Sequence, residues 1–183
     1  MKKAFLLLAS IAISIGACFA QAQKVPPTIT APEFVFKEDA TFTTGTDNEY
    51  IIYKATGYKK AELYNAVLLG LYKLYLKPEQ VLSTLDNEII IVNGRSPYCV
   101  RYKSSDYAFS YSIRFLFKDG KIRVDTPIAR AFIPDSGEER SNIAGWMKVQ
   151  DNYDQVKPGF EGGIKNEIMK ILLLAFSKTE NNW

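Results

Sequence analysis

The clearest pattern along the chain is a strict alternation of apolar and polar residues over 109–117. Its apolar members are Phe109, Tyr111, Ile113, Phe115 and Phe117. Because successive residues of a strand point to opposite faces, the pattern predicts a strand with one buried face and one wet face. Asp119-Gly120 then predicts a tight turn, and the alternation resumes on a returning strand over 121–128. A β-hairpin is therefore the most strongly predicted element.

Weaker strand patterns precede this hairpin. The segments rich in β-branched and aromatic residues are 33–36, 49–56, 81–85, 88–92 and the irregular 97–102. Asp86-Asn87 predicts a turn between two of them, and Asn93-Gly94 predicts a tight turn that ends the strand over 88–92. Pro97 favours a place at a sheet edge for the last of these strands.

Two segments change to a helical period. Over 59–76 the apolar residues recur at intervals of three and four, and Lys77-Pro78 ends the pattern. A second helix is predicted to begin at Gly162 or Gly163, with an apolar stripe that runs to residue 175. Between the two, residues 134–163 keep no single period and carry at most a helical turn around 142–149. That stretch is either a functional loop or an unrecognised element.

These elements follow in the order β-α-β-β-β-β-α, and two stretches of them resemble a known family. The stretches are 55–65 (ATGYKKAELYN) and 111–124 (YSIRFLFKDGKIRV). They are similar to exported bacterial proteins of the domain-of-unknown-function family 4468, described as having a TATA-binding-protein-like fold. The resemblance covers about 49–128. It implies an α+β fold with a curved antiparallel sheet of four to six strands and helices packed on one face, and it implies no known activity.

The N-terminus has the order of a secretory signal peptide. Lys2 and Lys3 precede an uncharged apolar run over 4–17, and small residues follow at Ala20 and Ala22. The run covers about 21 Å as a helix, short of the roughly 30 Å hydrocarbon core, which favours a cleaved signal over a membrane span. Residues 15–18 (IGAC) also resemble a lipobox, in which Cys18 would be acylated and would tether the protein. We favour the ordinary signal and keep lipidation as the alternative.

The predicted organisation is a signal peptide over 1–22, an extended leader over 23–48 and a single α+β domain over 49–183. Removal of the signal deletes two lysines, so the 23 cations of the chain fall to 21 against 20 acids and the net charge is about +1. A chain so nearly neutral has no overall basic field, which argues against nucleic acid as a partner. Membrane association is expected only if Cys18 is lipidated.

Catalytic chemistry is restricted by the absence of histidine from the whole sequence. Ser-His-Asp triads, Cys-His dyads and histidine-ligated zinc or haem are excluded. After ordinary cleavage Cys99 is the one cysteine left, so no intramolecular disulfide forms, and without a base nearby we interpret Cys99 as a packed thiol. The paired acids at 38–39 and 138–139 are interpreted as solvated charges. No catalytic residue, metal ligand or cofactor is predicted.

Four cations on the wet face of the predicted sheet form the candidate binding site: Arg101, Lys103, Arg114 and Arg123. They would suit an anionic or aromatic ligand, although cations on an exposed sheet face are also what half-buried strands ordinarily carry. We expect a non-enzymatic module of the periplasm or cell envelope that binds a small ligand or an envelope protein. The alternatives are a histidine-free hydrolase that uses acids near 134–163, and a lipid-anchored component of an envelope assembly.

Overall fold

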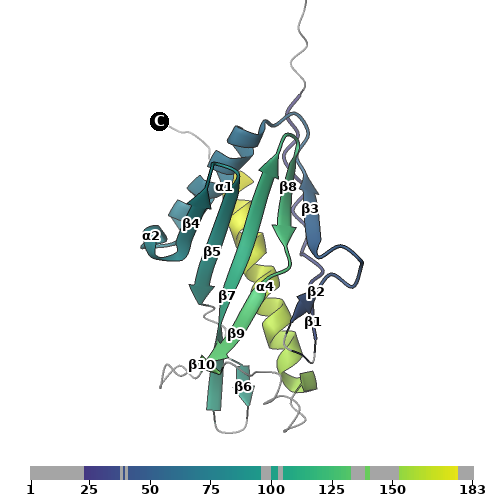
Figure 1. The fold of residues 1–183 in the computed structure, drawn as a ribbon, viewed down its shortest axis with the longest axis vertical. Coiled ribbons are helices and arrows are strands. Elements are labelled where there is room, and N and C mark those ends of the chain that lie inside the picture. The colour runs from purple at the N-terminus through teal and green to yellow at the C-terminus, as the bar shows by residue number, and fades with distance from the viewer. Residues whose placement is uncertain are drawn as a thin grey trace, which may run out of the picture.

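The structure, a computed structural model, describes residues 23–37, 39, 41–95, 100–102, 105–132, 139–140 and 153–176. Within these residues the elements are β1 (Val35–Phe36), β2 (Phe42–Thr43), β3 (Tyr50–Lys54), α1 (Lys60–Leu74), α2 (Pro78–Val81), β4 (Leu82–Leu85), β5 (Ile89–Arg95), β6 (Val100–Tyr102), β7 (Ser105–Lys118), β8 (Lys121–Asp125), β9 (Ile128–Phe132), β10 (Glu139–Arg140) and α4 (Tyr153–Phe176). The predicted α+β class is confirmed (Figure 1). None of the described helices combines the length and the apolar character needed to cross a bilayer.

Strand β7 organises the sheet, because its 14 residues are long enough to pair with several neighbours. It pairs antiparallel with β5 and with the short β6, and it also pairs with β9 over residues 108–112 and with β8 over residues 115–118. Strand β3 continues the sheet beyond β8, and β4 continues it beyond β5. The predicted hairpin is present as β7–β8, and Gly120 in its turn has the positive φ of 74° that glycine adopts without strain. The single returning strand predicted over 121–128 was wrong, because β8 ends at Asp125 and Ile128 begins the separate β9 with its side chain 62% exposed.

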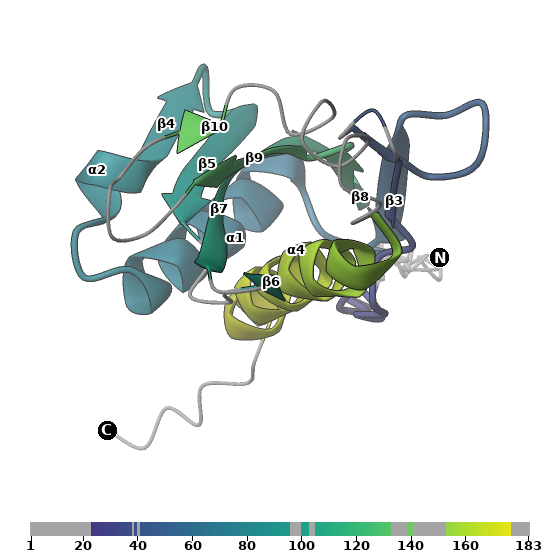
Figure 2. The ribbon, with the colours of Figure 1, turned by 90° about the horizontal axis from the view of Figure 1, so that it is seen from below.

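Helices α1 and α4 pack side by side and cover one face of the curved sheet (Figure 2). The core lies between the helices and the inward residues of the strands, as the alternation in β7 and β8 predicts. Its largest fully buried side chains are Phe34, Phe36, Phe115, Phe160, Leu63, Leu71, Ile90, Ile113, Ile122 and Ile164. The two helices approach closely at Gly70, where an added Cβ would lie 2.8 Å from the backbone nitrogen of Ala175.

The segment expected as an extended leader, 23–48, contributes to this core. Residues 23–34 have no helix or strand, and β1 and β2 then form a separate two-stranded sheet. Phe36 stacks on Phe160 of α4 with ring centres 4.8 Å apart, and its backbone nitrogen donates a 2.8 Å hydrogen bond to Glu161. Phe34 and Phe42 are also buried. The packed part of the chain therefore begins before residue 49.

Two further predicted boundaries were wrong. The tight turn at Asn93-Gly94 is absent, since β5 continues to Arg95 and Gly94 pairs with Tyr111. Glycine is needed there for space, because an added Cβ would lie 2.5 Å from the tyrosine hydroxyl oxygen. The turn between β4 and β5 is the one predicted at Asp86-Asn87, whose φ values are 50° and 52°, and it is closed by a 2.9 Å hydrogen bond from the backbone nitrogen of Glu88 to the carbonyl oxygen of Leu85.

The second of these boundaries is the start of the last helix. Helix α4 begins at Tyr153, well before the predicted Gly162 or Gly163, and it contains Pro158. Pro158 is the sixth residue of α4, beyond the first turn, so its ring removes one intrahelical backbone hydrogen bond from the helix. The short α2 was not predicted either. The helical turn predicted around 142–149 lies outside the described residues.

Candidate functional site

The face of the sheet opposite α1 and α4, called here the open face, is the candidate site. Because Tyr111, Ile113 and Phe115 of β7 point to the core, Ser112 and Arg114 point to the open face. The pairing register places Asn93 of β5 beside Ser112 on the same side of the sheet. The described helices α1 and α4 leave this face uncovered (Figure 2).

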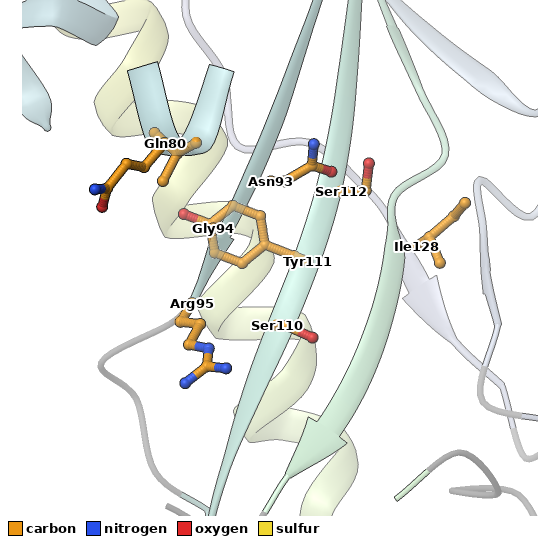
Figure 3. Close-up of a pocket in the computed structure, with 9 residues that line it drawn as sticks. Gln80, Asn93, Gly94, Arg95, Ser110, Tyr111, Ser112 and Ile128 are labelled. Atoms are coloured by element: carbon orange, nitrogen blue, oxygen red, sulfur yellow. The ribbon is translucent and has the colours of Figure 1, made fainter. Parts of the chain in front are cut away.

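A groove of about 740 Å³ lies in the open face, between α2 on one side and the start of β9 on the other (Figure 3). Its lining residues, which define the sheet-face groove, are Gln80, Val81, Asn93, Gly94, Arg95, Ser110, Tyr111, Ser112 and Ile128. The groove forms where β5 extends beyond the end of β4, since Leu82 of β4 pairs with Val92 and the chain before Leu82 turns away as α2.

The floor of the groove consists of directly opposed residues on β5 and β7. Asn93 lies opposite Ser112, and Arg95 lies opposite Ser110. These side chains bring hydroxyl, amide and guanidinium groups to the floor, and Arg95 and Ser110 also take part in other interactions within the chain. Ile128, which pairs with Ser112 from β9 and is 62% exposed, adds an apolar wall. The floor is therefore polar, with one cation and one apolar side.

A buried hydrogen-bonded network lies behind this floor. Tyr75, just after α1, donates a 2.6 Å hydrogen bond to the carboxylate of Glu167, and its hydroxyl oxygen lies 3.0 Å from that of Tyr111. Since the hydroxyl hydrogen of Tyr75 is used for Glu167, Tyr111 donates to Tyr75. Burial raises the pKa of both tyrosines, and the bond to Glu167 adds to the effect on Tyr75. The network holds the ring of Tyr111 beneath Gly94 and so fixes the floor.

Two of the four predicted cations lie together in the described part of the chain. Arg114 and Arg123 come together on the open face, where both contact Asp125, at 3.6 Å and 2.5 Å. The guanidinium of Arg123 also lies 4.1 Å from the ring centre of Tyr50. These contacts neutralise and position the two arginines.

The other two cations were expected on the same face. Arg101 belongs to β6, where its backbone pairs with Asp106. At about 3.3 Å per residue, the position of Asp106 on β7 is roughly 26 Å from that of Arg114. Lys103 lies outside the described residues, as do Cys18 and Cys99.

Several acidic residues have partners in the structure. Glu88 forms an ion pair with Lys60, and Glu161 accepts the hydrogen bond from Phe36 and lies 3.9 Å from Lys157. Asp39 bonds the hydroxyl and the backbone nitrogen of Thr41. In the part of the chain that the structure describes, no three acidic or cysteine residues gather as a metal site would require.

Comparison with known proteins supports the fold and no function. The sequence matches no family profile and no curated protein. Two solved structures are similar in shape. A TBP-like protein from Parabacteroides distasonis aligns with a TM-score of 0.53 and 11% identity over 69% of this chain and 90% of that one. A DUF4468 family protein from Bacteroides ovatus aligns with a TM-score of 0.54 and 10% identity over 85% of this chain and 100% of that one.

The fold is TATA-binding-protein-like. The resemblance predicted from the sequence is thus confirmed at the level of architecture. At 10–11% identity the comparison carries no residue roles, because a shared fold does not imply a shared site. Any function of this TATA-binding-protein-like domain has to be argued from its own side chains.

The groove residues were largely missed from the sequence. Ser110 and Ser112 were recognised as wet-face positions, and Arg95 and Gln80 were not singled out. Asn93 was interpreted as part of a turn. The signal that would have found it is the continuation of alternation through 93–95, with Val92 and Gly94 inward and Asn93 and Arg95 outward.

Proposed function

We propose that this chain is an exported, non-enzymatic binding module of the periplasm or cell envelope, and that its sheet-face groove binds a small polar ligand. The groove is the observation that carries the proposal. Its volume of about 740 Å³ falls within the range of roughly 300–1,000 Å³ that is usual for small-molecule sites. A protein partner would more often use a flatter and larger surface.

The chemistry of the groove favours binding over catalysis. Its described lining holds hydroxyl and amide groups and one guanidinium, and it includes neither a carboxylate nor a thiol. A serine hydroxyl needs a neighbouring base to act as a nucleophile, and the chain has no histidine. Hydroxyl, amide and guanidinium groups are suited to a ligand that carries hydroxyl, amide or carboxylate groups.

The proposed location in the periplasm or cell envelope rests on the signal peptide pattern over 1–22. Processing at Ala20 or Ala22 would release the domain, whereas acylation at Cys18 would tether it as a lipoprotein. The hydrolase alternative depends on acids near 134–163. Of these, Glu161 is engaged with Phe36 and Lys157, so no described observation favours that alternative.

The test compares a variant in which a large side chain fills the groove with a matched control variant altered outside it. Ser112→Phe places a ring over the groove floor, and Ser83→Phe makes the same change on the open face of β4, outside the groove. The processed protein is screened by NMR against short peptides, sugars and carboxylic acids. A ligand that shifts groove amides in the wild type and in Ser83→Phe, and not in Ser112→Phe, supports the proposal. Binding unaffected by Ser112→Phe, or turnover that depends on one acid, would refute it.

A further inference from the structure

Three lysines on neighbouring strands lie directly opposite one another at one end of the open face. Lys121 of β8 pairs with Lys54 of β3 on one side and with Lys118 of β7 on the other. All three are exposed. We call Lys54, Lys121 and Lys118 the lysine row. Like charges that face each other across strands destabilise a sheet, so the row is unfavourable unless an anionic partner neutralises it.

The other lysines at this end are already neutralised. Lys24 pairs with Glu62, Lys59 with Asp119, and Lys60 with Glu88. Within the described residues, no acid lies at ion-pair distance from any member of the lysine row. Glu88, which is electrostatically close to Lys118, is held by Lys60. The row therefore adds three uncompensated charges to a chain whose mature net charge is only about +1.

The N-terminal segment joins the domain at the same end. The backbone nitrogen of Val25 donates to Thr56, two residues beyond Lys54. The β7–β8 turn is bound to that region as well, because Ala55 donates to Gly120 and Gly120 donates to Tyr58. Figure 1 shows the ends of β3 and β7 and the start of β8 beside the start of α1. The start of the described chain thus lies next to the lysine row.

We propose that the lysine row is a docking surface for the anionic phospholipid headgroups of a membrane. Three charges spaced about 4.8 Å apart along a strand row suit a flat array of phosphates. The sheet-face groove lies at the other end of the open face, where β5 passes α2. Docking would therefore leave the groove accessible.

The lipobox alternative fits the same geometry. If Cys18 were acylated, residues 18–23 would span at most about 20 Å, which would keep the row within a few Debye lengths of the bilayer. One acyl chain alone anchors a protein only marginally, and a basic patch supplies the second signal that stable anchoring needs. Without acylation the row would give a weak and salt-dependent association.

The test measures partition of the processed protein onto vesicles of phosphatidylcholine with about 30% phosphatidylglycerol, against phosphatidylcholine alone. We expect salt-sensitive binding to the anionic vesicles only. Each lysine contributes roughly five-fold, so Lys54→Gln, Lys118→Gln and Lys121→Gln together should lower the partition coefficient about 100-fold.

The matched control removes three other exposed lysines, by Lys37→Gln, Lys73→Gln and Lys77→Gln, and should change binding less than about two-fold. Equal losses in both triple variants would show that only net charge matters and would overturn the proposal. Release by inorganic phosphate at constant ionic strength would mean a soluble anion site instead. Neither result depends on the groove, so a failure of membrane docking can be distinguished from a failure of ligand binding in the groove.

A single substitution tests the row without lipid. Lys121→Gln removes both like-charge contacts and should raise the Tm at low ionic strength, whereas Lys73→Gln should leave it unchanged. An unchanged Tm for Lys121→Gln would show that the three charges do not repel one another and would count against the row.

Discussion

Gly70 is the position at which the smallest change should have the most specific effect on stability. It lies within α1, where alanine would ordinarily be the better residue. A Cβ placed on it would lie 2.8 Å from the nitrogen of Ala175, 3.0 Å from the Cα of Ala175 and 3.2 Å from the carbonyl oxygen of Ile171. All three atoms belong to the backbone of α4, so no side-chain rotation relieves the contact and the two helices must separate.

The magnitude follows from two opposing terms. Glycine in a helix interior costs about 0.8–1 kcal/mol relative to alanine, and Gly70→Ala recovers that amount. Forcing an extra methyl group into a packed interface typically costs about 1–3 kcal/mol. The net expectation is a loss of about 1 kcal/mol. Gly162→Ala in α4 is the matched control, because nothing lies within 4 Å of its Cβ position and only the favourable term remains. It should gain about 0.8–1 kcal/mol.

The assay is urea unfolding followed by far-UV circular dichroism on the processed protein. The two variants should differ by about 2 kcal/mol with unchanged m-values, which corresponds to roughly 4–8 °C in Tm for a chain of this size. A changed m-value would mean that the unfolded state was altered. If Gly70→Ala proved as stable as Gly162→Ala, the close packing of α1 on α4 would be refuted.

Three further predictions concern buried and paired polar groups. Burial raises the pKa of Tyr53 to about 12 from its usual value near 10, so the unfolded state ionises first, and the stability of the wild type should fall relative to Tyr53→Phe as the pH rises from about 10 to 12. Parallel losses in urea titrations of both proteins would contradict this. Glu167→Leu should cost about 1–3 kcal/mol because it leaves the hydroxyl of Tyr75 without its acceptor, and Glu167→Gln should cost less; equal unfolding free energies for the two would exclude that bond as the cause. Asp125→Asn should cost under about 1 kcal/mol, since its arginine partners are largely exposed, and a larger loss in thermal unfolding would show that the pairs matter more than such contacts usually do.

The parts of the fold that could be predicted are those in which one local pattern determines both the element and its buried face. The β7–β8 hairpin is the best case, because alternation gives the strand, its inward face and the turn at Asp119-Gly120 together. Helix α1 is similar, since its apolar period ends sharply at Lys77-Pro78. Tyr111, Ile113, Phe115 and Phe117 of β7, Ile122 and Val124 of β8, and Tyr64, Val67 and Leu71 of α1 are buried as the pattern predicts, whereas Ile128 is 62% exposed. Local periodicity and tertiary burial agree here, so sequence alone was sufficient.

The errors occurred where glycine was interpreted from its local context. Asn93-Gly94 has the sequence of a hairpin turn, yet Gly94 serves to make room for Tyr111 across the sheet. Gly162 and Gly163 have the appearance of a helix entry, yet they lie inside α4. For Gly94 the decisive partner, Tyr111, is distant in sequence, whereas nothing lies within 4 Å of a Cβ placed on Gly162. No local rule separates a glycine that allows a turn from one that allows a close contact or is tolerated within a helix.

The candidate site shows the same limit in its chemistry. The cations that the sequence singled out are conspicuous as charges, but Arg114 and Arg123 are held by Asp125, whose position beside both depends on the pairing of β7 with β8. The groove is built instead from uncharged residues that no motif marks, and it exists because β5 is longer than its neighbour β4. The full lysine row likewise becomes visible only in the register, where Lys54 of β3 lies beside Lys118 and Lys121 of the β7–β8 hairpin. Binding surfaces on a sheet depend on which strands lie side by side, and that information is absent from the pattern of any single strand.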